Sequence, residues 1–278
     1  MLKKYGMKNT VDTYSRDVNV VYHCDDLYVD ALIVSIYSAV QFNKNLKFHI
    51  ISSCCYDNIK KLQKLRNKFN IDIKIYCVSY VLFDTYNIPE QYKRLLNPHP
   101  IKVLYEILKQ QYTDEIPFTA APLFYFVFHE YIFNFDRYIF LDCDTIVQED
   151  LQQLYMYDLK DKIIAMRRCW SYDLISYKSK HYKAYNGSVY VATKDIFPYM
   201  KKMYDHTIEN LEWAKLGVQH SMNVVLDNKV TDLDKRWNYS VKKDKDEMCA
   251  FIYHYNTLLR HPEIKDSLYK KYEDSCHR

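Results

Sequence analysis

Glycine is scarce in this chain, which has only Gly6, Gly187 and Gly217 among its 278 residues. G-x-G-x-x-G turns and P-loops need several glycines close together, because their backbone bends tightly around phosphate groups. The three glycines lie too far apart to form either loop. A phosphate-binding function in this chain must therefore rely on a metal ion and on side chains.

Long apolar runs and cysteine pairs are also missing. No apolar run reaches the ~18 residues that a membrane-spanning helix needs, and residues 1–17 form a polar leader without signal-peptide character. The eight cysteines include no C-x-x-C pair, which argues against a zinc knuckle, and most lie in apolar stretches typical of reduced thiols. We therefore expect a soluble, cytoplasmic protein without a transmembrane segment.

The composition favours a folded α/β protein. Hydrophobic residues make up 49% of the chain, which is enough for a full core, and the net charge of +4 is spread along the sequence. Such a charge suits small anionic ligands, and we expect no nucleic-acid partner. The simplest organisation is one catalytic domain over residues 18–262, followed by a basic C-terminal tail over residues 263–278 that folds back.

Apolar strand-like stretches alternate with amphipathic helical ones, which is typical of a mostly parallel sheet flanked by helices, Rossmann-like in its nucleotide-binding half. The patterns predict strands at 19–24, 47–52, 71–78, 138–144, 162–166, 188–192 and 251–256, and helices at 31–40, 58–69, 119–131, 194–213 and 221–226. Residues 84–117 are predicted as a loop-rich flap with a short helix near 101–110. Ligands of such sheets bind at the carboxyl ends of the strands.

Two aspartates, Asp142 and Asp144, follow directly on an apolar stretch that starts at Tyr138. In a strand, residues i and i+2 share one face, so both carboxylates would point the same way and Cys143 would face the core. Placing two charges there costs several kcal/mol unless a cation compensates them. A divalent metal that carries a phosphate would do so, and a pair that merely caps a loop is the alternative.

A histidine and an arginine near the C-terminus could complete such a site. His254 lies at the end of a predicted strand, six residues before Arg260. Two carboxylates and one imidazole suit a manganese-like ion better than calcium, and an arginine can hold a diphosphate with two hydrogen bonds. A core or surface histidine without a ligand role is the alternative reading of His254.

Several segments together resemble glycosyltransferase family 8, the group that contains glycogenin and bacterial lipopolysaccharide galactosyl- and glucosyltransferases. The matching segments, in chain order, are Asn19–Tyr28, Phe118–Glu130, Leu141–Asp144, Tyr185–Val189, Gln219–Asn223, Arg236–Asn238 and His254–Arg260. They are similar to the family's opening strand with its acidic pair and tyrosine, the helix before the metal motif, the D-x-D motif, and the F-N-S-G-V, D-Q-D-x-L-N, R-W-N and H-x-x-G-x-x-K motifs. The resemblance covers roughly residues 18–262.

This resemblance implies a GT-A fold and a retaining transfer from a UDP-sugar to a glycan, lipid or protein acceptor. It implies that Asp25 hydrogen-bonds the uracil and that Tyr28 stacks on it, and we place His23 and Cys143 among the cofactor-binding residues as well. Related enzymes are often monomers or homodimers, so we expect one of these states.

The resemblance also implies catalytic and metal-binding roles. Asp142, Asp144 and His254 would hold Mn²⁺, with Mg²⁺ as the second candidate, and Asp142 would thereby contact the nucleotide cofactor. Arg260 would stabilise the leaving diphosphate, in the place of the family's lysine. The remaining catalytic residues would be Asn186 and Gln219, which face the donor sugar.

The chain departs from the family pattern mainly where the sugar should bind. Tyr125 replaces an arginine, the pair Arg167-Arg168 stands where the family has an acidic residue, Val218 replaces the first Asp of D-Q-D, and Thr257 replaces a glycine. A nucleotide-sugar-binding module with weak or no transferase activity therefore remains the alternative. A metal-dependent phosphohydrolase is less favoured, because a second carboxylate cluster is not evident in the sequence. The 29 tyrosines would suit self-glycosylation, but biased codon usage is our preferred explanation.

Overall fold

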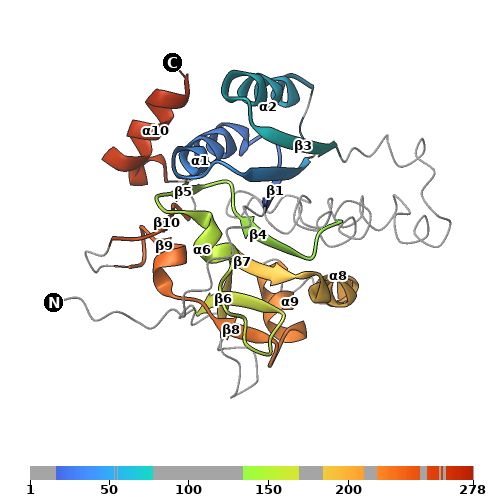
Figure 1. Ribbon diagram of the computed structural model, residues 1–278. Coiled ribbons are helices and arrows are strands. Elements are labelled where there is room, and N and C mark those ends of the chain that lie inside the picture. The colour runs from blue at the N-terminus through green and yellow to red at the C-terminus, as the bar shows by residue number, and fades with distance from the viewer. Residues whose placement is uncertain are drawn as a thin grey trace, which may run out of the picture.

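The protein is built around a seven-stranded sheet with the strand order β3-β2-β1-β4-β7-β6-β8 (Figure 1). The computed structural model describes residues 17–52, 54, 56–77, 134–168, 184–209, 218–244, 249–256, 258 and 261–277. The strands of this sheet are β1 (Val18–Cys24), β2 (Leu46–Ser52), β3 (Asp72–Cys77), β4 (Arg137–Leu141), β6 (Ile164–Arg168), β7 (Tyr185–Thr193) and β8 (Val230–Asp232). Strands β1 to β4 run parallel, whereas β7 is antiparallel to both β4 and β6. The predicted α/β class with a mostly parallel sheet is confirmed.

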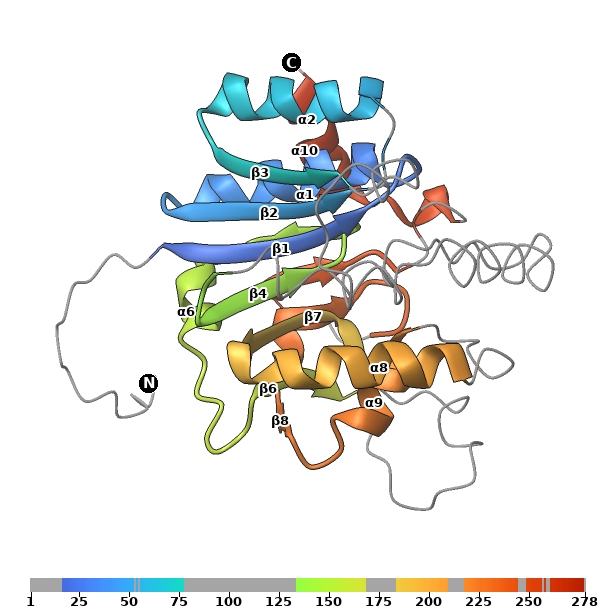
Figure 2. The ribbon, with the colours of Figure 1, turned by 90° about the vertical axis from the view of Figure 1, so that its right-hand side faces the viewer.

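Helices cover both faces of this sheet (Figure 2). One face carries α1 (Val29–Phe42), α2 (Tyr56–Phe69), α6 (Leu151–Tyr155) and α10 (Ser267–His277), and the other carries α8 (Phe197–Glu209) and α9 (Val218–Val225). The described residues also include short 3-10 turns in the connections between elements: η2 (Lys194–Ile196), η4 (Lys235–Asn238) and η5 (Pro262–Ile264). The helices predicted at 31–40, 58–69 and 221–226 are confirmed, with boundaries shifted by a few residues.

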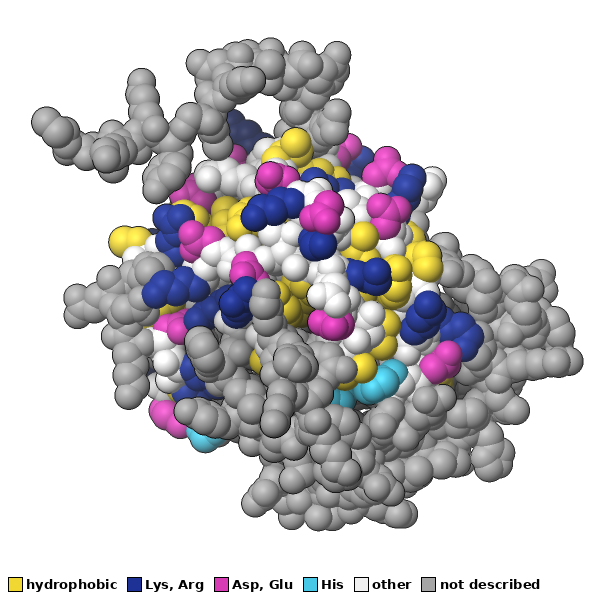
Figure 3. All heavy atoms as spheres, turned by 90° about the horizontal axis from the view of Figure 1, so that it is seen from below, with side chains coloured by type: hydrophobic (Ala, Val, Ile, Leu, Met, Phe, Trp, Pro, Cys, Tyr) yellow, Lys and Arg dark blue, Asp and Glu magenta, His cyan; other side chains and the backbone are white. Residues whose placement is uncertain are grey.

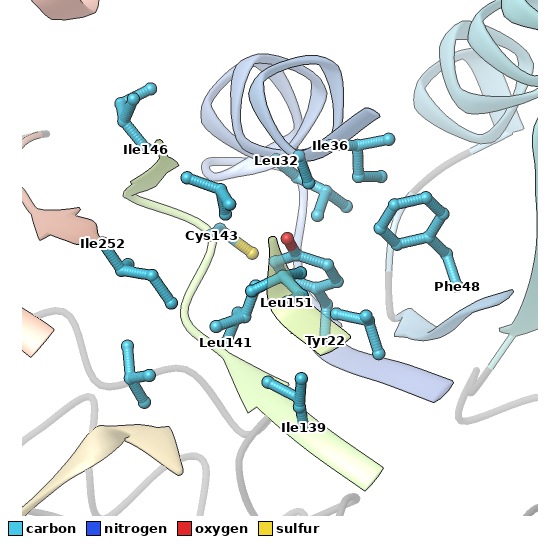
Figure 4. Close-up of a cluster of buried hydrophobic side chains, with 14 of the residues drawn as sticks. Tyr22, Leu32, Ile36, Phe48, Ile139, Leu141, Cys143, Ile146, Leu151 and Ile252 are labelled. Carbon is cyan, nitrogen blue, oxygen red and sulfur yellow. The ribbon is translucent and has the colours of Figure 1, made fainter. Parts of the chain in front are cut away.

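A second, three-stranded sheet packs beside α1. It consists of β5 (Thr145–Val147), β10 (Ile252–His254) and β9 (Tyr239–Ser240), with β10 in the middle. Ile146 and Ile252 of this sheet join the same apolar cluster as Leu32 and Ile36 of α1 (Figure 4). This shared core fixes the end of β10 next to the loop that follows β4.

Side chains of β1 alternate between two cores, one on each side of the main sheet. Val20 and Tyr22 point into the core around α1, whereas Val21 belongs to the core that α8 and α9 cover. The buried hydroxyl of Tyr22 lies 3.0 Å from Ser35 Oγ, which in turn lies 2.9 Å from Thr145 Oγ1. This chain of hydroxyl groups links β1 and α1 to the beginning of β5, immediately after the aspartate pair.

The C-terminal segment differs from the basic tail that we expected. Helix α10 packs on α1 and buries Tyr269, Tyr272 and Cys276 in the core. Tyr255 after β10 donates a hydrogen bond of 2.7 Å to Asp266 Oδ1, which also accepts from the backbone N–H of Tyr269. Over residues 263–278, the four Asp and Glu residues equal the three Lys and Arg278 in number. The segment folds back as part of the core.

Some expectations concern residues whose structure is not described. The predicted flap at 84–117 with its short helix and the aromatic helix at 119–131 lie outside the described residues. Within the described ranges, no helix is both long and apolar enough to cross a membrane.

Candidate metal and nucleotide site

The aspartate pair lies in a turn and not at the end of a strand. Strand β4 ends at Leu141, so that Asp142, Cys143 and Asp144 connect it to β5. Strand alternation therefore does not align the two carboxylates, contrary to our prediction. The carboxylates converge because the turn is held by its neighbours.

Three hydrogen bonds hold this turn. The backbone N–H of Asp142 donates to Ser188 O of β7 at 2.8 Å, and the Thr145 hydroxyl donates to Asp142 O at 2.9 Å. On the other side, the backbone N–H of Tyr255 donates to Asp144 O at 2.9 Å. The turn is thus tied to both sheets, which limits the positions that the two carboxylates can take.

His254 reaches the aspartates through the pairing of β10 with β5. In this antiparallel pair His254 lies opposite Thr145, the residue that follows Asp144. His254 Nε2 lies 3.2 Å from Asp144 Oδ1 and 3.8 Å from Asp142 Oδ2, and the three ligand atoms all lie within 4.8 Å of one another. Neighbouring ligands of an octahedral ion with bonds of ~2.1 Å are about 3 Å apart. Small shifts of the side chains would therefore let all three bind one ion.

Burial changes the protonation of this cluster. Asp144 and His254 are 5% and 2% exposed, whereas the side chain of Asp142 is 29% exposed. Burial raises the pKa of Asp142 to about 7, against an opposing effect of His254, and the charge of Asp144 raises it further. Burial alone would lower the pKa of His254, but the nearby carboxylates outweigh it and the pKa is raised. The site therefore holds protons near neutral pH that a metal ion would displace.

Cys143 and His23 lie between the turn and strand β1. Cys143 faces the core, as expected, and its thiol donates to His23 O with an Sγ–O distance of 3.1 Å (Figure 4). The His23 ring packs on Phe140 with 5.1 Å between ring centroids, and its buried Nδ1 has no hydrogen-bond partner in the described structure. Burial lowers the pKa of His23 to about 4, so the ring is neutral at pH 7. The cofactor-binding roles of both residues stay predictions.

Asp25 and Tyr28 follow β1 at its carboxyl end. Asp25 Oδ1 accepts hydrogen bonds from the backbone N–H groups of Leu27 at 3.0 Å and Tyr28 at 3.2 Å. Asp25 Oδ2 is buried and has no partner among the described residues. Burial and the charges of Asp144 and Asp142 raise the pKa of Tyr28, which indicates that its ring lies close to the metal-site carboxylates. A buried acceptor without a donor is costly unless a ligand supplies one.

Asn186 and Gln219, the two residues predicted to face the sugar, lie together on β7 and α9. Asn186 Oδ1 accepts from the backbone N–H of Ser188 at 2.9 Å and from Asn238 Nδ2 at 2.9 Å. Gln219 Oε1 accepts from the backbone N–H of Gly187 at 3.3 Å. Both side chains are only partly buried, so each can also contact a ligand.

The arginines that depart from the family pattern are both engaged in ion pairs. Arg167 binds both carboxylate oxygens of Asp244, at 2.5 and 2.7 Å, and Arg168 pairs with Asp232 at 2.6 Å. Three further positions of the sequence analysis, Arg260, Tyr125 and Thr257, lie outside the described residues.

The sequence analysis gave no role to one residue of the site, Asn238. It was quoted only as the last residue of the Arg236-Trp237-Asn238 segment. Asn238 is 2% exposed, and its Oδ1 lies 3.2 Å from His254 Nδ1. An asparagine directly after a tryptophan in a buried segment indicates a polar contact. The sequence does not show that the partner of Asn238 is His254.

Comparisons with known proteins bear on the fold and the family of the chain. A search of curated proteins finds no match. Among solved structures, the fold is similar to a galactosyltransferase, LgtC, in complex with donor and acceptor sugar analogs (TM-score 0.62, 15% identity, 94% of this chain and 95% of that chain). It is also similar to the glycosyltransferase GlyE of Streptococcus pneumoniae (0.57, 15%, 94% and 63%) and to mouse xyloside xylosyltransferase 1 (0.57, 13%, 87% and 98%).

At these identities the structural likeness establishes the fold, and it confirms the GT-A class. The sequence itself matches the family profile described as Glycosyl transferase family 8 over residues 19–261. This match spans most of the chain and includes the Asp142–Asp144 turn, Asn238 and His254. The chain therefore belongs to glycosyl transferase family 8.

Proposed function

We propose that this protein transfers a sugar from a nucleotide-sugar donor, a UDP-sugar, to a glycan, lipid or protein acceptor, with Mn²⁺ or Mg²⁺ bound at the Asp142–Asp144 turn. The observation that carries the proposal is the convergence of Asp142, Asp144 and His254 from two separate sheets. A chain that buries three such groups together at the strand ends gains a compensating charge when a cation binds.

The residues fit both the ion and the nucleotide. Two carboxylate oxygens and one imidazole nitrogen are ligands that Mn²⁺ accepts, and Mg²⁺ is the second candidate. The free, buried Oδ2 of Asp25 supports recognition of a nucleobase N–H, such as that of uracil, beside the ring of Tyr28. Arg260 is proposed to contact the diphosphate on the sequence pattern alone.

When bound, the metal would neutralise the charge that develops on the leaving diphosphate. Asn186 and Gln219 would hold the hydroxyl groups of the donor sugar by hydrogen bonds from their amides. Because amides cannot act as carboxylate nucleophiles, and because Val218 replaces the family's Asp, we propose a front-face retaining reaction. In this reaction the leaving phosphate accepts the proton of the acceptor hydroxyl.

The described residues on the face seen in Figure 3 suit a small charged ligand better than a polyanion. On the face seen in Figure 3, basic and acidic side chains lie interspersed over the described residues. A nucleic-acid site would instead need a continuous basic stripe. We accordingly propose a nucleotide-sugar and an acceptor as partners.

Calorimetry with UDP and Mn²⁺, combined with turnover of a panel of UDP-sugars, tests the proposal. We expect UDP to bind more tightly when Mn²⁺ is present, and we expect at least one sugar to be hydrolysed or transferred. Asp144→Asn should abolish both the Mn²⁺ effect and turnover. The control is Asp57→Asn on α2, whose side chain is 88% exposed.

The same experiment addresses the second candidate, a nucleotide-sugar-binding module. Its support is the sugar side, where Arg167 is occupied by Asp244 and Val218 replaces an Asp. Tight, Mn²⁺-dependent UDP binding without turnover of any sugar would favour the module. If Asp144→Asn changes neither binding nor turnover, the metal assignment is wrong.

A further inference from the structure

Asn238 ends the turn η4 and lies on the side of His254 that faces away from the aspartates. His254 Nδ1 contacts Asn238 Oδ1, while Nε2 of the same ring faces Asp142 and Asp144. Asn238 is 2% exposed, so water cannot easily replace this contact. The buried amide therefore controls which ring nitrogen of His254 carries the proton.

The direction of the hydrogen bonds follows from a backbone donor. The N–H of Ser188 can only donate, so the Asn186 atom that it contacts at 2.9 Å must be the amide oxygen. That same oxygen contacts the Asn238 amide at 2.9 Å, so Asn238 presents its Nδ2 there. The other amide atom of Asn238, its oxygen, must then be the atom that faces His254 Nδ1.

An amide oxygen can only accept, so the Nδ1 of His254 must carry the hydrogen. In the neutral ring, Nε2 then holds the free lone pair, 3.2 Å from Asp144 Oδ1. This is the tautomer that a metal ligand requires, and the ring is also held at the angle that directs Nε2 to the carboxylates. The opposite tautomer would place a hydrogen where the ion is proposed to bind.

We propose that Asn238 is a positioning residue that holds His254 as the Nδ1–H tautomer and thereby prepares Nε2 for the metal. The inference rests on the proposed metal-binding function. The tautomer of His254 is then fixed by a chain of contacts that runs from Ser188 through Asn186 and Asn238 to His254. It also gives Asn186 a second role, because the residue predicted to face the sugar also orients the amide behind the metal ligand.

The backbone of Asn238 is itself held in place. Its carbonyl oxygen accepts from Arg167 Nη1 at 2.5 Å, and the guanidinium of Arg167 binds both oxygens of Asp244. Asp244 Oδ2 also accepts from the backbone N–H of Ser240 at 2.7 Å. A fixed backbone restricts the amide to the position that meets His254.

The test uses the full-length chain and three variants. Asn238→Leu removes both amide contacts at similar size, whereas Asn238→Asp keeps an acceptor facing His254. The matched control is Asn43→Leu, because Asn43 also makes contacts through its amide, accepting from Leu151 N–H at 2.7 Å and donating to Ala39 O at 2.8 Å, at the C-terminal end of α1. Thermal unfolding of each variant first verifies that it is folded.

The first measurement is made without metal, at a pH above the raised pKa of His254, so that its ring is neutral. Nitrogen-15 NMR of histidine-labelled protein, with His254→Gln used for assignment, reports the tautomer directly. We expect the Nδ1–H form in the wild type, in Asn238→Asp and in Asn43→Leu, and a mixture in Asn238→Leu. An Nε2–H form in the wild type, or an unchanged tautomer in folded Asn238→Leu, overturns the inference.

The second measurement is the affinity for Mn²⁺ by electron paramagnetic resonance. Loss of an outer hydrogen bond to a metal ligand weakens binding by about 10- to 100-fold, which we expect for Asn238→Leu, with a change of only a few-fold for Asn238→Asp. Wild-type affinity in folded Asn238→Leu overturns the inference. Failure of the proposed function looks different, because the wild type would then bind no Mn²⁺ or Asp144→Asn would bind it equally well.

Discussion

The candidate site has two halves, a metal and nucleotide half at the ends of β1 and β4 and a sugar half on β6, β7 and α9, and their polar groups are paired to different extents. At the ends of β1 and β4, the pairing of the polar groups is incomplete: Asp25 Oδ2 has no described partner, and three atoms that could hold a metal ion lie within 4.8 Å of one another. On β6, β7 and α9, the polar groups are paired among themselves, as in the Arg167–Asp244 ion pair. The first half is thus prepared for a ligand, whereas the second already uses part of its hydrogen-bonding capacity internally.

This difference bears on how the enzyme would choose a donor. Unsatisfied buried groups gain free energy when a ligand supplies a partner, so the metal and nucleotide half should provide most of the donor's binding free energy. Groups that are already paired gain less, so the sugar half should discriminate by shape and by its partly exposed amides. Changes in the first half should therefore abolish binding, and changes in the second should alter the preference among sugars.

Removal of one proposed metal ligand should have the largest effect on activity. In Asp144→Asn the site loses one of two negative charges, and charge stabilisation by a catalytic metal amounts to several kcal/mol. We expect kcat/KM for any accepted UDP-sugar to fall by about 10³-fold. Activity within a few-fold of the wild type, at saturating Mn²⁺, would show that the convergence of ligands has no catalytic role.

The ion pair of Arg167 with Asp244 should matter mainly for stability. Both side chains are largely buried, at 17% and 14% exposure, and breaking such a pair costs about 3–5 kcal/mol. Arg167→Met should lower the free energy of unfolding by about 3 kcal/mol, measured by urea denaturation. The matched control is Arg168→Met, because the Arg168–Asp232 pair is about half exposed and should contribute less than about 1 kcal/mol. Equal losses in both variants would contradict our view that Arg167 is a structural support.

Much of the fold could be predicted from the sequence. Strands β1, β2 and β3 and helices α1 and α2 lie within two residues of the expected ranges, because their apolar spacing is regular. The boundary of β4 could not be found, because Thr145–Val147 continues the apolar pattern after the aspartates and makes two strands look like one. Only the hydrogen bonds of Asp142 with Ser188 and Thr145 show where the chain turns.

The candidate site could be predicted only in part. Asp142 and Asp144 stood out through their position after an apolar stretch, but the approach of His254 depends on the pairing of β5 with β10. These strands have three residues each, too few to carry a periodic pattern, and they are far apart in the sequence. The role of Asn238 requires a chain of side-chain contacts that no spacing rule describes.

The buried carboxylate oxygen of Asp25 is the next feature to test, because it is proposed to recognise the nucleobase. In Asp25→Asn, the Asn oxygen can keep the turn with Leu27 and Tyr28, but an NH₂ group replaces the free acceptor. A buried polar mismatch of this kind costs about 1–3 kcal/mol, so the affinity for UDP should fall by about 10- to 100-fold. Mn²⁺ affinity without nucleotide should not change. The neighbouring exposed Asp26→Asn is the control, and equal effects of both variants would remove Asp25 from the nucleotide site.

The pH dependence of Mn²⁺ binding follows from the protons that the site holds. The pKa of Asp142 is about 7 and that of His254 is raised above its usual value, so both groups gain protons as the pH falls below 7. The ion must displace them, and its affinity should fall by up to about tenfold per pH unit for each proton released. His23, with a pKa of about 4, stays neutral in this range. Titrations at pH 5, 6, 7 and 8 measure the slope, and a flat affinity over this range would remove His254 and Asp142 from the metal site.

The smallest expected effect tests the sugar half at Gly187. A Cβ there would lie 3.1 Å from Met222 Sδ and 3.8 Å from Gln219 Cγ, which is tight for the first contact and ordinary for the second. Because a methionine side chain can move, Gly187→Ala should cost only about 1 kcal/mol of stability while shifting the residues that are proposed to face the sugar. We expect kcat to change by about tenfold, and differently for different UDP-sugars, while the affinity for UDP with Mn²⁺ stays constant. The variant could instead weaken UDP binding and leave the ranking of sugars unchanged. A change on β7 would then act on nucleotide binding, and our assignment of sugar preference to this half of the site would be wrong.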